Sequence, residues 1–154
     1  MGLLSSLLGK KKNETKPQKR AVTASKTNQV KKNNKEWSKL NQDLTKKAQN
    51  KEVYDREAGS IRLKQADILR REGKYVDSIL MVALGFLTNN YKYGDMNKSA
   101  FIKRISSSAE KAGLKKADVN HIADILNSYV KSNNGSEAAL TKDIKAYIMK
   151  AKKS

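Results

Sequence analysis

Nine consecutive residues, Ile79 to Leu87, read ILMVALGFL and carry no polar side chain. A helix built from them is apolar on every side, so it must be surrounded by a lipid bilayer or by a protein core. Spanning a bilayer takes about 20 such residues. The stretch is therefore predicted to be the central helix of a small bundle.

Residues that interrupt helices are scarce in the rest of the chain. The 154 residues include a single proline, Pro17, and eight glycines. Apolar residues recur at helical spacing from a helix start near Asn34 to the end of the chain, with a break expected at Gly59-Ser60. The predicted fold class is all-α: a small helical bundle of four to five helices, preceded by a disordered basic N-terminal tail.

The positive charge of the chain is concentrated at its beginning. The chain has 33 Lys and Arg against 15 Asp and Glu, a formal net charge of +18, and large apolar residues are almost absent between residues 10 and 35. Such a segment cannot bury enough surface to offset the entropy cost of ordering it. The predicted organisation is an amphipathic N-terminal segment (1–9), a disordered Lys-rich linker (10–35) and a helical domain (36–154).

Lysine, which dominates the basic residues, is a hydrated point charge suited to sequence-independent phosphate contacts. Nucleic acid is therefore the expected partner. One group of candidate contacts lies in the N-terminal part, and a second forms a basic face on the folded part. The candidates are Lys10, Lys11, Lys12, Lys16, Lys19, Arg20, Lys31, Lys32, Arg62, Lys64, Arg70, Arg71 and Lys74.

The opening residues, MGLLSSLLG, suggest a second kind of partner. Four leucines would share one side of a short helix, and three lysines follow them. Burying four leucines is worth on the order of 6–10 kcal/mol gross, and nearby lysines are attracted to anionic lipids. The predicted membrane contacts are Leu3, Leu4, Leu7 and Leu8. The same leucines would also fit docking on the chain's own core or on a neighbouring copy.

Residues 96–130 are predicted to form a helical hairpin. It opens with Met96-Asn97-Lys98-Ser99, turns at Ala112-Gly113-Leu114 and restarts at Lys115-Lys116-Ala117. On these residues the segment resembles the N-terminal hairpin of the HU/IHF family of bacterial DNA-bending proteins. Ser99 is expected to cap the first helix, and Gly113 to adopt the left-handed conformation. The family's β-ribbon arms have no counterpart here, so the resemblance implies only a basic surface and a homodimer through the helical domain.

Motifs for catalysis or metal binding are absent from the sequence. The chain has no Cys, and its single His, His121, is expected to face solvent beside Asp124. No phosphate-binding loop, zinc-protease motif or nucleophile elbow occurs. We therefore expect no enzymatic activity, no metal and no cofactor.

Two tyrosines, Tyr91 and Tyr93, flank Lys92 on a loop that is expected to be exposed. Such a loop could stack on single-stranded bases, and packing over the ends of the hairpin is an equally good explanation.

The sequence thus favours a non-enzymatic, strongly basic accessory protein that binds nucleic acid mainly through phosphates. The alternatives are a peripheral membrane adaptor held by its first residues, and a structural or assembly protein of a phage or virion. The expected location is the cytoplasm, including the inner face of the membrane.

Overall fold

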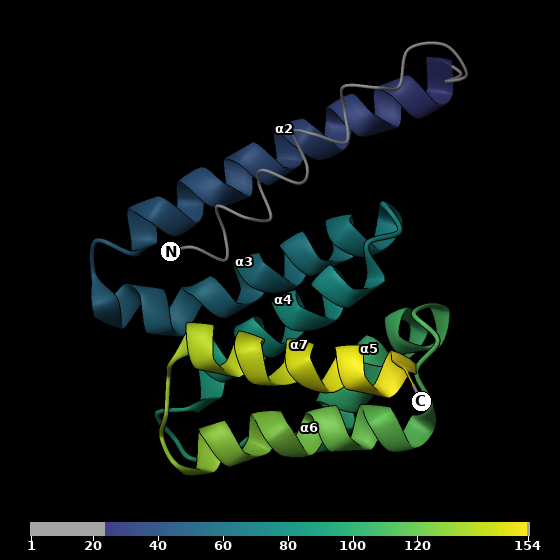
Figure 1. The fold of residues 1–154 in the computed structure, drawn as a ribbon. Coiled ribbons are helices and arrows are strands. Elements are labelled where there is room, and N and C mark those ends of the chain that lie inside the picture. Colours follow the sequence, from purple (N-terminus) through teal and green to yellow (C-terminus); the bar gives the residue numbers. More distant parts are fainter. Residues whose placement is uncertain (1–23, 154) are drawn as a thin grey trace. The chain divides into compact units, whose positions relative to one another are not determined.

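The computed structural model describes residues 24–153, and the side chains of residues 29–153. All regular structure in this part of the chain is helical: six helices and no strand (Figure 1). The all-α prediction is confirmed, and the number of helices exceeds the expected four to five. The predicted segment 1–9 and the first part of the linker, 10–23, lie outside the described residues.

The first described helix, α2 (Ala24–Lys47), begins well before the predicted start near Asn34. The prediction of a disordered linker up to residue 35 is therefore wrong for residues 24–35. Neither Pro nor Gly occurs between Pro17 and Gly59, so nothing in the backbone chemistry interrupts a helix here. Gln29 also donates a hydrogen bond to Asn33 one turn later, at 2.9 Å, an interaction that stabilises exposed helices.

The chain divides after Gln42 into two units, which are described separately. The second unit contains α3 (Lys51–Arg71), α4 (Tyr75–Asn90), α5 (Lys98–Lys111), α6 (Lys116–Lys131) and α7 (Glu137–Lys153). Helix α4 is its centre, since it packs against each of the other four. Residues 78–85, 87 and 88 of α4 are buried, as the apolar run predicts. No helix in the described range is long and apolar enough to cross a membrane.

Helix α3 passes through Gly59 without the predicted break. Gly59 is buried because α4 approaches the backbone closely at this point. A Cβ added to Gly85 of α4 would lie 3.0 Å from the Gly59 carbonyl oxygen. The two glycines therefore permit close helix packing, and Gly59 does not act as a helix breaker.

The predicted hairpin is present as α5 and α6. Asn97 caps α5, because its Oδ1 accepts a hydrogen bond from Ala100 N at 3.0 Å, so the expectation that Ser99 caps it is wrong. Gly113 has the expected left-handed conformation, with φ +84. Leu114 N then donates to Ala109 O at 2.9 Å, which closes the end of α5. Asn133, with φ 54, plays the same part after α6.

Candidate functional site

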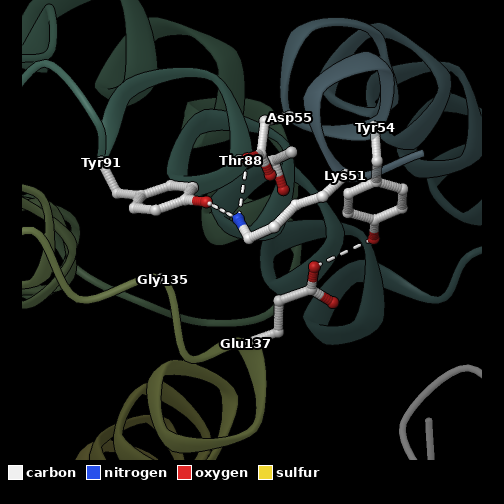
Figure 2. Close-up of a pocket in the computed structure, with 7 residues that line it drawn as sticks. All are labelled: Lys51, Tyr54, Asp55, Thr88, Tyr91, Gly135 and Glu137. Carbon is white, nitrogen blue, oxygen red and sulfur yellow. Dashed lines mark hydrogen bonds and ion pairs between the residues drawn. The ribbon is translucent and has the colours of Figure 1, made fainter. Parts of the chain in front are cut away.

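A pocket of about 210 Å³ lies where the start of α3, the end of α4 and the turn before α7 meet (Figure 2). Its lining residues are Lys51, Tyr54, Asp55, Thr88, Tyr91, Gly135 and Glu137. Most of these residues have polar or charged side chains, and two sets of charged residues account for the geometry of the pocket.

The first set surrounds Asp55, whose side chain is only 8% exposed. Its Oδ2 atom lies 2.8 Å from Lys51 Nζ and 3.0 Å from Lys92 Nζ. Burial alone would raise the pKa of Asp55, but hydrogen bonds from Lys51, Lys92 and Tyr91 outweigh it, so the pKa is lowered. Lys51 also donates to the Tyr91 hydroxyl at 2.9 Å (Figure 2). The start of α3 is thereby tied to the segment that follows α4.

The second set centres on Arg62, which is fully buried although it was predicted to be a surface contact. Its Nη2 atom lies 2.7 Å from Glu137 Oε1 at the start of α7. The Tyr54 hydroxyl donates to Glu137 Oε2 at 3.0 Å and accepts a hydrogen bond from Arg62. Burial raises the pKa of the Tyr54 hydroxyl.

Each carboxylate in this pocket is paired with at least one cation. The carboxylate of Asp55 has two ammonium partners, and the carboxylate of Glu137 has a guanidinium. The pKa shifts of Lys51, Tyr54 and Asp55 all move these groups away from neutral values. The pocket is best described as a set of tertiary contacts that joins α3, the end of α4 and α7.

The predicted basic face on the folded part is only partly present. Lys64, Arg70 and Arg71 are exposed. Arg62 does not belong to this face, because it shares the buried side of α3 and is neutralised by Glu137. Lys74 is also largely covered, with 9% of its side chain exposed and Nζ 3.6 Å from Glu72.

The other predicted contacts lie in the first unit or outside the described residues. Lys31 and Lys32 are exposed on α2, in the first unit. The remaining basic candidates, Lys10 to Arg20, and the four N-terminal leucines lie outside the described residues.

A second basic surface, which sequence reasoning did not identify as a site, occupies one end of the second unit. We call it the lysine end, and its residues are Lys111, Lys115, Lys116, Lys152 and Lys153, all exposed. They come from the last residue of α5, the turn into α6 and the last turn of α7. Figure 1 shows the end of α7 beside the α5–α6 connection, and Lys115 and Lys152 line one shallow pocket of about 250 Å³.

Among residues 24–153, no ion pair neutralises the lysine end. None of the ion pairs between described residues involves its five ammonium groups. The carboxylate of Asp118 lies beside the lysine end and offsets part of its charge. It accepts hydrogen bonds from Lys115 N at 2.9 Å and from the Tyr147 hydroxyl at 2.7 Å. These two hydrogen bonds, and more weakly the charges of Lys115 and His121, lower the pKa of Asp118.

Helix-terminal lysines are the sequence signal that could have indicated this surface. Lysines at the ends of α5 and α7 also complement the helix dipoles, so each one taken alone has an ordinary explanation. That three such helix ends meet is a property of the tertiary fold.

His121 and the two loop tyrosines have distinct surroundings. His121 is exposed, as predicted, and its ring stacks on Tyr147 at 4.2 Å between ring centroids. Tyr91 is held by Lys51, whereas Tyr93 is 81% exposed. The part of the chain from residue 24 to residue 153 contains no group of three or more His, Asp or Glu side chains that could hold a metal ion.

Comparisons with known proteins give no relative for this chain. No family model matches it, and neither a curated protein nor a solved structure is significantly similar to it. The resemblance of residues 96–130 to the HU/IHF hairpin therefore stays a prediction.

Proposed function

We propose that this chain is a non-enzymatic accessory protein that binds nucleic acid mainly through phosphate contacts. The observation that supports the proposal best is the lysine end. Five exposed lysines from three helices gather there, and none of their ammonium groups forms an ion pair within residues 24–153. A folded surface with such an excess of cations favours a polyanionic partner.

The different partners of the arginines and the lysines support the same proposal. Four arginines of the second unit pair with carboxylates of the protein: Arg56, Arg62, Arg70 and Arg104. Arginine is the side chain that reads base edges through paired hydrogen bonds, whereas lysine contacts phosphate as a point charge. A partner at the lysine end would therefore be held by its phosphates, with little dependence on base sequence.

The test measures binding of the full chain to a DNA duplex across a salt series. A variant with Lys111, Lys115, Lys116 and Lys152 changed to Gln is compared with a control in which Lys46, Lys103, Lys142 and Lys145 are changed to Gln. Both variants lose the same formal charge, but the control removes exposed lysines that are spread over α2, α5 and α7. Each phosphate contact contributes about 0.9 to the slope of log affinity against log salt.

We expect the lysine-end variant to lower that slope by about 3, and the control to lower it much less. A flat salt response of the unmodified chain would refute the proposal. Equal losses in the two variants would refute the role of the lysine end. Phosphatidylserine vesicles are measured in parallel, and a lysine-end variant that loses vesicle binding but keeps duplex affinity would show that the anion is a lipid headgroup.

A further inference from the structure

The turn after α4 holds two tyrosines in opposite surroundings. Tyr91 is part of the fold: its hydroxyl accepts a hydrogen bond from Lys51, and a Cβ added to Gly135 would lie 2.9 Å from its ring. Tyr93, two residues later, is 81% exposed, more than any other large apolar side chain in the described part of the chain. The fold explains Tyr91 and leaves the ring of Tyr93 without a structural role.

The backbone beneath Tyr93 is nevertheless well defined. Tyr93 N donates a hydrogen bond to Asn90 O at 3.0 Å, and Gly94 takes a left-handed φ of +68. A Cβ added to Gly94 would lie 3.4 Å from Asn133 Oδ1, so this turn packs against the turn that follows α6. A tyrosine on a fixed backbone offers a large contact area and loses little conformational entropy when it is covered.

The exposed residues on the turn of Tyr93 and at the adjoining end of α6 are polar, and they include two lysines and one aspartate. Lys92 is 43% exposed while it pairs with Asp55, and Lys131 is exposed at the end of α6. Asp95 and Asn134 are exposed as well. An aromatic anchor for a protein partner is normally ringed by apolar neighbours that exclude water. Tyr93 has no such ring of neighbours, and an aromatic side chain with cations nearby suits a nucleic-acid base better.

From these observations we propose that Tyr93 stacks on an unpaired base, so that the preferred partner is single-stranded nucleic acid. This inference rests on the function proposed above and specifies its partner. Phosphate contacts alone do not distinguish a single strand from a duplex, whereas base stacking requires a base that is free of its neighbours. In a duplex the bases are already stacked on one another, and an exposed ring on a turn gains nothing from them.

The experiment uses the full chain and two probes of the same length, an oligothymidine of about twelve nucleotides and a duplex. Tyr93→Ala removes the ring, and Tyr93→Phe restores a ring without the hydroxyl. The control is Met149→Ala, which removes the other large exposed apolar side chain, 57% exposed on α7. Thermal melting is used to check that each variant is folded. Substitutions at such exposed positions should have little effect on stability.

We expect Tyr93→Ala to weaken oligothymidine binding on the order of tenfold and to leave duplex binding unchanged. Tyr93→Phe and Met149→Ala should bind both probes as the unmodified chain does. If Tyr93→Ala weakens both probes equally, or neither, Tyr93 is not a stacking residue, and the phosphate-binding proposal stands. If the unmodified chain binds neither probe in dilute buffer, the proposed function fails, and this inference fails with it.

Discussion

Arg62 of α3 and Glu137 of α7 form an ion pair, 2.7 Å between Nη2 and Oε1, across 75 residues of sequence. The guanidinium is fully buried, whereas 25% of the Glu137 side chain is exposed. The buried positive charge of Arg62 is therefore compensated by a partly exposed carboxylate in the first turn of α7. This pair, together with Tyr54, fixes the start of α7 against α3.

Removing the acidic partner should destabilise the fold strongly. Glu137→Ala leaves Arg62 buried without a carboxylate, and we expect a loss of about 3 kcal/mol in the free energy of unfolding. The measurement is urea denaturation followed by circular dichroism. Glu110→Ala, at an exposed position of α5, is the control and should change stability by less than about 0.5 kcal/mol.

Replacing both partners should cost less than replacing Glu137 alone. The double variant Arg62→Met with Glu137→Gln no longer buries an unpaired charge, and apolar replacements of buried ion pairs are often tolerated. A double variant as unstable as Glu137→Ala would contradict this account of Arg62.

The contribution of Asp55 to the stability of the fold should be lost in acid. The folded state lowers the pKa of Asp55, so its ionised form stabilises the fold above the unfolded value of about 3.9. That contribution is lost as the pH falls through the lower, folded-state pKa. We expect Asp55→Asn to lower the melting temperature at pH 7, and the difference from the unmodified chain to shrink as the pH falls below the unfolded-state value.

The control for this pH series is Asp95→Asn, an exposed position on the turn after α4. It should leave the melting temperature unchanged throughout. An Asp55→Asn deficit of constant size from neutral to acid pH would mean that Asp55 acts through packing and not through its charge.

The two glycines at the α3–α4 contact should respond differently to a methyl group. Gly85→Ala places Cβ 3.0 Å from the backbone carbonyl oxygen of Gly59, so the helices must separate. Gly59→Ala meets the end of the exposed Asn89 side chain, which can rotate away. We expect Gly85→Ala to cost about 1–3 kcal/mol and Gly59→Ala to be nearly neutral, because alanine gains helix propensity of about 1 kcal/mol.

Chemical denaturation of the two single variants checks this prediction. If Gly59→Ala is the more destabilising of the two, the close approach is limited by Asn89 and not by the backbones.

Deletion of residues 2–9 should leave duplex affinity and its salt dependence unchanged. The segment contains the four leucines but no lysine, so it removes no phosphate contact. If the leucines contact lipid, the same deletion releases the chain from anionic vesicles, because burial of the leucines supplies most of the apolar binding energy. Co-sedimentation with vesicles and a duplex titration give the two readouts. A loss of duplex affinity would place residues 2–9 in the nucleic-acid interface.

Sequence periodicity was sufficient for the fold class and for the central helix. The apolar run from Ile79 to Leu87 is too short to span a bilayer, so it was predicted to be a buried helix. The structure buries it at the centre of the bundle. The left-handed Gly113 was also predictable, because the chemistry of a helix end is local.

Several errors arose where the role of a residue depends on a partner far away in the sequence. Gly59 looks like a helix breaker until Gly85 is placed beside it. Arg62 was predicted to be a surface cation because its ion pair with Glu137, 75 residues away, cannot be read from the sequence. The lysine end was not predicted because its residues lie at the ends of three helices, and periodicity within one helix does not say which helix ends meet.

The lysine end also has a consequence for how affinity and folding are coupled. Its residues belong to segments about 40 positions apart that are brought together only by the packed bundle. A peptide carrying α7 alone would hold part of the charge without the arrangement. Heat or urea should therefore separate these lysines in the same cooperative step that unfolds the helices. The loss of polyanion binding at the lysine end would then follow the unfolding transition.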